Sequence, residues 1–100
     1  MRLRYTKPAL SDLDSILSYI AERSAQSAAR VHARIEGVTD FLLIYPRVGR
    51  LTDDPTIRRI PTTPYPYLIF YEIAEGEIII HAVRHGARSP SGMPGTASRG

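Results

Sequence analysis

The stretch from Tyr65 to Arg88 reads YPYLIFYEIAEGEIIIHAVRHGAR and decides the fold of this chain. Isoleucine, valine, tyrosine and phenylalanine are dense in Tyr67–Ile73 and Glu77–Val83, and these residues favour a pleated, half-buried backbone. The intervening AEG at residues 74–76 ends in Gly76, which can take the positive φ that a tight turn needs. We therefore expect a β-hairpin whose second strand leads into a basic segment.

Both faces of this hairpin are apolar. Side chains alternate between the two faces of a strand. Leu68 and Phe70 then oppose the set Tyr67, Ile69, Tyr71 and Ile73, and Ile78, Ile80 and Ala82 oppose Ile79, His81 and Val83. Helices of the same chain can cover one face. The other face has little cover within the chain, which suggests that a partner binds there.

Apolar periodicity predicts a strand and two helices before the hairpin. Arg2–Thr6 alternates as a short strand, and Thr6 can cap a helix that runs to about Arg23. The apolar stripe of this helix consists of Leu10, Leu13, Ile16, Leu17 and Ile20. A second helix begins at Ala25 or Ala28, after a break at residues 24–27, and continues to Tyr45, where Pro46 stops it. Its stripe consists of Ala28, Val31, Ile35, Val38, Leu42 and Tyr45.

The elements follow the order β-α-α-β-β-β. A polar loop spans Arg47–Pro55, and a short strand at Ile57–Ile60 precedes the hairpin. Helices followed by a run of strands indicate an α+β fold, in which the helical hairpin packs on one face of a small antiparallel sheet. We expect one domain over residues 1–88 and a disordered tail over residues 89–100, where glycine, proline and serine dominate.

The composition restricts the function classes. The 100 residues contain no cysteine and no apolar run of the ~18 residues that a spanning helix needs, and the N-terminus has no apolar signal core, so we expect a cytoplasmic protein. The net charge is +3. Residues 84–100 contain Arg84, Arg88 and Arg99 but no acid, whereas acids and bases balance in the rest of the chain. This distribution favours an anionic partner, or it simply keeps a solvated tail soluble.

The histidines do not predict a metal site, and no cofactor is expected. His81 and His85 would share a strand face about 13 Å apart, which is too far for one ion. His81 lies where an apolar residue would fit, so we interpret it as a hydrogen-bonded core histidine. His85 either caps the sheet through a backbone hydrogen bond or contacts a target.

The sequence resembles the ParE/RelE superfamily of toxins from type II toxin–antitoxin systems. The resemblance rests on YPYLIFYEI and EIIIHAVRHGARSP, on FLLIYPRVGR with its Pro46, Gly49 and Arg50, and on the N-terminal strand with its leucine-rich helix. It covers about residues 1–90. It implies a small α+β toxin that a cognate antitoxin holds inactive by wrapping it and covering an apolar groove. From charge, we expect the toxin-binding half of that antitoxin to be acidic.

The superfamily contains two mechanisms. ParE-like toxins inhibit DNA gyrase without cutting a bond themselves, whereas RelE-like toxins cleave mRNA on the ribosome. RNA cleavage needs a proton acceptor, a proton donor and cations on the phosphate. RelE-like enzymes use lysine and arginine clusters with a tyrosine, or a Glu/Arg/His set, but Lys7 is the only lysine here. The ParE branch is therefore favoured. The alternatives are a ribosome-dependent RNase and a non-toxic module that only binds the antitoxin.

The resemblance also assigns candidate site residues. Candidates for target binding are Arg84, His85 and Arg88. Candidates for antitoxin binding are Leu13, Leu17, Tyr67, Ile69 and Tyr71. If the protein is an RNase, the catalytic candidates are Arg59, Arg84 and His85. Arg58 and Arg59 point to opposite faces of a strand, so at most one of them belongs to any given site.

Overall fold

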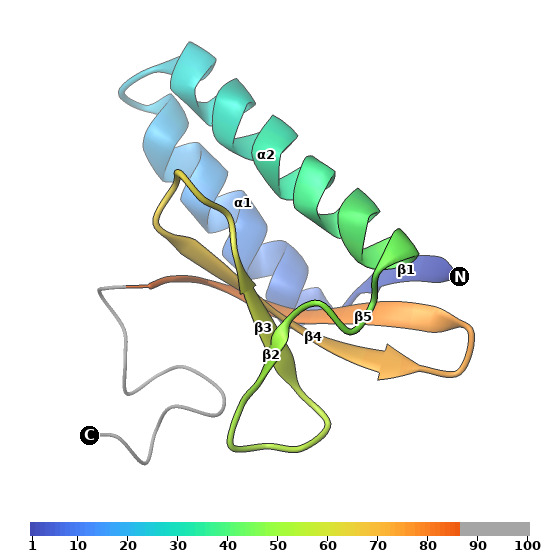
Figure 1. Ribbon diagram of the computed structural model, residues 1–100. Coiled ribbons are helices and arrows are strands. Elements are labelled where there is room, and N and C mark those ends of the chain that lie inside the picture. Colours follow the sequence, from blue (N-terminus) through green and yellow to red (C-terminus); the bar gives the residue numbers. More distant parts are fainter. Residues whose placement is uncertain (87–100) are drawn as a thin grey trace.

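The computed structural model describes residues 1–86, so Arg88 and the expected tail lie outside the described residues. The elements are β1 (Arg2–Tyr5), α1 (Lys7–Ala21), α2 (Ala25–Ile44), β2 (Arg50–Leu51), β3 (Arg58–Pro61), β4 (Tyr67–Ala74) and β5 (Glu77–His85). The helical hairpin packs on one face of a single sheet (Figure 1). The predicted α+β fold and the order of its elements are confirmed, with one additional strand.

Local signals in the sequence set the helix boundaries. The Thr6 hydroxyl accepts a 3.2 Å hydrogen bond from the N–H of Ala9, and Pro8 lies in the first turn of α1. The Ser24 hydroxyl accepts a 3.1 Å bond from the N–H of Ser27 at the start of α2. These side chains satisfy N–H groups that have no partner inside the helix. Tyr45 caps the C-terminal end of α2, directly before the predicted stop at Pro46.

The sheet is mixed rather than purely antiparallel, which corrects the sequence-based expectation. Its strand order is β1-β5-β4-β3-β2, and β1 pairs with β5 in parallel. The chain leaves β1, forms the two helices, crosses to the far edge and returns by antiparallel steps to β5. The first strand therefore lies beside the last one.

Two short strands differ from their predicted form. Residues Arg50–Leu51, expected to be part of a loop, form β2 at the sheet edge and pair with β3. The strand expected at Ile57–Ile60 is shifted by one residue, to Arg58–Pro61. A strand of two residues has no periodicity, so its sequence gives no pattern to recognise.

A β-bulge at His81 corrects the predicted alternation of β5. Tyr71 pairs with Ile80 and Phe70 pairs with Ala82, so His81 is an extra residue opposite β4. After this bulge, the side chains of β5 point to the faces of the sheet opposite to those that simple alternation predicts. Val83 therefore joins Ile78 and Ile80 under the helices, and Ala82 packs on the opposite face.

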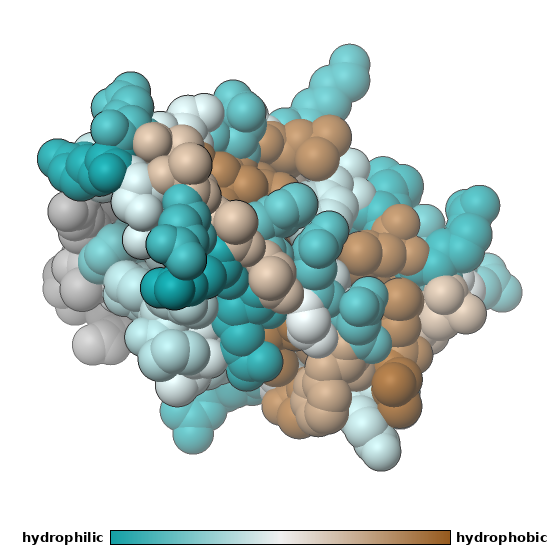
Figure 2. Space-filling view, turned by 90° about the horizontal axis from the view of Figure 1, so that it is seen from above, coloured by the Kyte–Doolittle hydropathy of each residue, from teal (hydrophilic) through white to brown (hydrophobic). Residues whose placement is uncertain are grey.

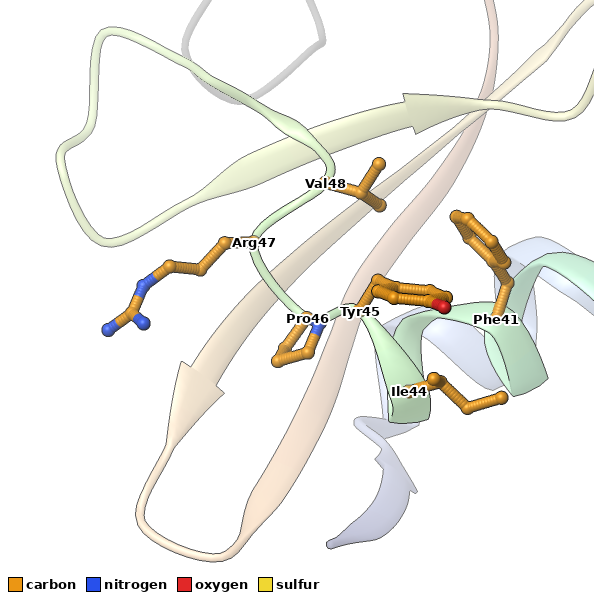
Figure 3. Close-up of a pocket in the computed structure, with 6 residues that line it drawn as sticks. All are labelled: Phe41, Ile44, Tyr45, Pro46, Arg47 and Val48. Atoms are coloured by element: carbon orange, nitrogen blue, oxygen red, sulfur yellow. The ribbon is translucent and has the colours of Figure 1, made fainter.

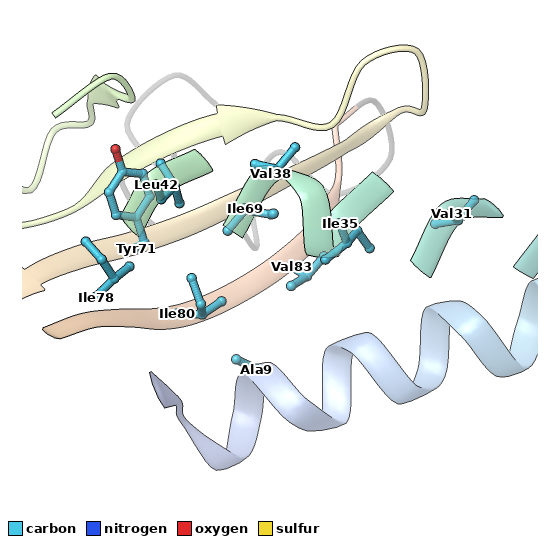
Figure 4. Packing of buried hydrophobic residues seen from close by; sticks show 10 residues of the cluster. All are labelled: Ala9, Val31, Ile35, Val38, Leu42, Ile69, Tyr71, Ile78, Ile80 and Val83. Atoms are coloured by element: carbon cyan, nitrogen blue, oxygen red, sulfur yellow. The ribbon is translucent and has the colours of Figure 1, made fainter. Parts of the chain in front are cut away.

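The main core lies between α2 and the sheet. Ile35, Val38 and Leu42 point from α2 toward the strands (Figure 4). From the strands, Ile69, Tyr71, Ile78, Ile80 and Val83 complete this layer (Figure 4). Ala9 of α1 is also fully buried in it.

The opposite face of the sheet is less exposed than the sequence suggested. Phe70 and Ala82 are buried there and form a small cluster with Ile57, which precedes β3. Ile79 is buried as well. The expectation that this apolar face needs a partner is therefore wrong for its central residues.

Candidate functional site at the end of the strand hairpin

The end of the β4–β5 hairpin brings two predicted site residues together. His85 pairs with Tyr67 across the strands, and their rings meet edge-on with centroids 5.5 Å apart. The backbone N–H of Gly86 donates a 2.7 Å bond to the carbonyl of Pro66, which closes the end of the hairpin. The His85 ring is therefore held against Tyr67 at a defined position.

The first helix completes this site. Ser15, Ile16 and Tyr19 line a hollow of about 240 Å³ together with Tyr67 and His85. Tyr19 is exposed, and the guanidinium of Arg23 lies 4.4 Å from the centre of its ring. We name this hollow, with Asp12 and Arg84 beside it, the strand-end site. It combines aromatic surface with positive charge.

Arg84 is anchored to α1. One carboxylate oxygen of Asp12 accepts a 3.0 Å bond from the N–H of Val83 and a 3.3 Å bond from Nε of Arg84. β1 pairs with β5 only at residues 77–80, so Asp12 satisfies a backbone donor on the edge that β1 leaves open. This edge-capping role of Asp12 had no signal in the sequence.

Arg59 lies apart from the strand-end site. It pairs with Phe70 on β4, whereas Arg84 pairs with Leu68, so both strand positions belong to the face opposite the helices. The Arg84 side chain nevertheless reaches Asp12 of α1, whereas within residues 1–86 no such contact joins Arg59 to the strand-end site. His85 pairs with Tyr67, which packs against the helix-side core. The three residues of the RNase alternative are thus divided between the two faces of the sheet. Arg58 and Arg59 point to opposite faces, as predicted. Arg58 lies on the helix side and donates a 2.8 Å bond to the carbonyl of Gly49.

The residues predicted to bind antitoxin differ in accessibility. Leu13, Leu17 and Tyr67 are half-buried and pack against the core. Ile69 and Tyr71 are fully buried, so a partner cannot touch them while the fold is intact. Burial raises the pKa of Tyr71, while a hydrogen bond from the N–H of Gly49 and the charge of Arg58 oppose this shift. Tyr71 therefore belongs to the framework of the fold.

A second polar pair lies on the face opposite the helices. Nε2 of His81 is 2.7 Å from a carboxylate oxygen of Glu72, and each side chain is 33% exposed. The predicted hydrogen bond of His81 is present, but the residue lies at the bulge and reaches solvent, so it is not a core histidine. Within residues 1–86, no group of three or more potential ligands is arranged to hold a metal ion.

Comparison with known proteins identifies the family. A family model described as the ParE toxin of the type II toxin–antitoxin system parDE matches residues 3–90. The chain belongs to the ParE toxin family. Among relatives of this ParE-family protein, Toxin RelE2 of Caulobacter vibrioides is 39% identical over 84 residues, which cover 84% of this chain and 93% of that protein.

A second relative and a solved structure are also similar to this chain. Putative toxin Y4kP of Sinorhizobium fredii is 38% identical over 84 residues, which cover 84% of this ParE-family chain and 86% of that protein. A chain of the chromosomal ParDE toxin–antitoxin system from P. aeruginosa has the same fold, with a TM-score of 0.73 and 23% identity. That match covers 85% of this chain and 95% of the other. In the ParE-family fold described here, no helix within residues 1–86 is long and apolar enough to cross a membrane.

Proposed function

We propose that this ParE-family toxin inhibits DNA gyrase through the strand-end site and is neutralised by a cognate antitoxin. The main support is the aromatic and cationic surface of the strand-end site, while the RNase candidates Arg59 and His85 lie on opposite faces of the sheet. Cleavage of RNA requires acid, base and cation to act on one phosphate. A protein that inhibits by binding needs only a complementary surface, and the aromatic and cationic strand-end site supplies one.

Purified toxin in gyrase supercoiling and DNA-cleavage assays tests this function. We expect lost supercoiling or trapped cleavage complexes, both reversed by the antitoxin. The Arg84→Ala, Arg88→Ala double variant should lose inhibition. A matched control is Arg2→Ala, Arg30→Ala, which removes two positive charges from exposed positions elsewhere. Unchanged gyrase activity with wild-type toxin would contradict the proposed target, and full inhibition by the first double variant would contradict the proposed site.

One observation favours an RNase as the second candidate function. Arg59, Glu72 and His81 emerge on the same face from three adjacent strands, and a hydrogen-bonded histidine–carboxylate pair is suited to proton transfer. In this candidate the catalytic set is Arg59, Glu72 and His81 instead of Arg59, Arg84 and His85. Cleavage of ribosome-bound mRNA by wild-type toxin, lost in His81→Ala, would support it. Intact mRNA with the wild-type protein would exclude it.

A further inference from the structure

The C-terminal end of α2 carries an apolar surface that the proposed gyrase site does not use. Phe41, Ile44, Tyr45, Pro46, Arg47 and Val48 line an open groove of about 530 Å³, which we name the α2-end groove (Figure 3). Ile44 is 68% exposed, and Phe41, Tyr45 and Val48 are exposed as well. Leu51 of β2 extends the exposed apolar residues of this segment. Figure 2 shows hydrophobic residues gathered toward the end of the molecule where α2 finishes.

The exposed residues of this segment are separate from the core. Phe41 and Ile44 lie on the exposed side of α2, while Val38 and Leu42 of the same helix are buried. Tyr45 and Val48 follow the end of the helix and are exposed, which corrects the sequence-based assignment of Tyr45 to the core stripe. The rings of Phe41 and Tyr45 touch, with centroids 5.0 Å apart. A contiguous apolar surface that stays in water is a feature of docking surfaces.

Residues 46–49, which form one side of the groove, are held in place by hydrogen bonds in the free protein. The Tyr71 hydroxyl donates a 2.7 Å bond to the carbonyl of Pro46 and accepts a 2.9 Å bond from the N–H of Gly49. Arg58 donates to the carbonyls of Arg47 and Gly49 at 3.2 and 2.8 Å. Residues 46–49 are therefore tied to β3 and β4. A surface ordered in advance loses less conformational freedom on binding.

Charge restricts the kind of partner. Arg47 and Arg50 are the only charged residues between Phe41 and Leu51, and both are exposed. The Arg47 side chain extends away from the apolar residues, at the rim of the groove (Figure 3). A second copy of this chain would bring the arginines of both copies together, which opposes self-association. Nucleic acid would meet the arginines but would leave the aliphatic Ile44 and Val48 without an apolar partner.

We propose that the α2-end groove binds an apolar segment of the cognate antitoxin that carries a carboxylate facing Arg47 or Arg50. Permanent complexes have more apolar interfaces than transient encounters, which favours the antitoxin over the target. This inference rests on the proposed antitoxin partnership and adds a contact surface outside the five antitoxin-binding residues predicted from sequence. It is independent of whether gyrase is the target.

The test measures binding of the full-length toxin to the purified antitoxin encoded by the reading frame beside the toxin gene. Ile44→Glu places a like charge against the acidic segment and removes the apolar contact. We expect the dissociation constant to rise roughly 30-fold or more, as for a residue central to an interface. Because Ile44 is exposed, the variant should unfold at the wild-type temperature. Ala33→Glu adds the same charge at an exposed position on the same helix and should bind normally.

Growth arrest by the toxin, measured with and without co-expressed antitoxin, shows whether the groove binds the antitoxin or the target. Ile44→Glu should still arrest growth, and co-expressed antitoxin should no longer rescue the cells. Rescue by antitoxin with unchanged affinity would overturn the proposal, as would equal weakening by Ala33→Glu. Loss of arrest with normal antitoxin binding would also overturn it and would assign the groove to the target. Failure of the gyrase assay leaves these binding results unaffected, so the two proposals can fail separately.

Discussion

The side chain of Tyr71 bonds to the backbone of Gly49, 22 positions earlier in the chain, through a 2.9 Å hydrogen bond to the tyrosine hydroxyl. The same hydroxyl donates to Pro46 at 2.7 Å. One buried oxygen in β4 therefore satisfies a donor and an acceptor of the loop that leaves α2. This arrangement joins the helical layer to the strand that carries much of the core.

Tyr71→Phe should destabilise the protein by about 2 kcal/mol, because it leaves the buried N–H of Gly49 and the partly buried carbonyl of Pro46 without their partner. Urea unfolding followed by circular dichroism measures this change. Tyr65→Phe is a control, because Tyr65 is half-buried and its hydroxyl has no such role among the hydrogen bonds described above. An equal effect of both substitutions would show that the Tyr71 hydroxyl has no special role.

Alkaline pH should weaken the fold through the same group. Burial raises the pKa of Tyr71 above its ordinary value of 10.0. The unfolded state therefore loses this proton first, so the stabilisation is fully present below about pH 10 and is lost as the pH rises through the folded-state pKa. Burial also raises the pKa of Tyr5, so part of the alkaline effect should persist in Tyr71→Phe. The difference in unfolding free energy between wild type and Tyr71→Phe should narrow above pH ~10. If the difference in unfolding free energy stayed constant above pH ~10, the predicted loss of stabilisation by Tyr71 would be wrong.

Two glycines should respond oppositely to alanine. A Cβ atom at Gly49 would overlap the Tyr71 hydroxyl and approach the Arg59 carbonyl oxygen to 2.9 Å, so Gly49→Ala should cost roughly 1–3 kcal/mol. A Cβ atom at Gly37 in α2 meets nothing within 4 Å, and Gly37→Ala should stabilise by roughly 0.5–1 kcal/mol. Thermal unfolding of both variants checks the contrast. Two shifts of the same sign would refute it.

Substitutions of Asp12 and Arg84 should distinguish an effect on the unfolding free energy from an effect on gyrase inhibition. Arg84→Ala removes a partly exposed ion pair and should change the unfolding free energy by less than about 1 kcal/mol. Asp12→Ala also removes the acceptor of the Val83 N–H and should cost about 1–3 kcal/mol. Gyrase inhibition should fall in Arg84→Ala although its fold is intact. A large loss of stability in Arg84→Ala would instead give this arginine a structural role.

Local chemistry in the sequence predicted most of the secondary structure. The hydroxyls of Thr6 and Ser24, Pro46 and the positive φ of Gly76 act through neighbouring residues, so the sequence shows their effect directly. The sequence did not show in the same way which strands pair over long distances along the chain. Nothing in Arg2–Tyr5 shows that it will lie parallel to β5 rather than antiparallel.

The site was predicted less completely for two physical reasons. The hairpin is apolar on both faces, so the exchange of faces after His81 leaves no mark in its polarity pattern. Periodicity also assigned Tyr67, Ile69 and Tyr71 to one face correctly but could not show that α2 covers the last two. Tyr67 was predicted to bind the antitoxin and His85 to bind the target, but the structure places both in the strand-end site. Ser15 and Tyr19 also line this site, and the sequence indicated only that they belong to a helix.

The parallel pairing of β1 with β5 has a consequence for synthesis. Within the described fold, β1 is synthesised first and has its only sheet neighbour in β5, the last strand. A contact between residues so distant in sequence forms slowly, because a long loop must close first. An aborted chain that ends before residue 77 would lack both the neighbour of β1 and the strand that carries Arg84 and His85. The proposed inhibitory surface would then form only after β5 has been translated.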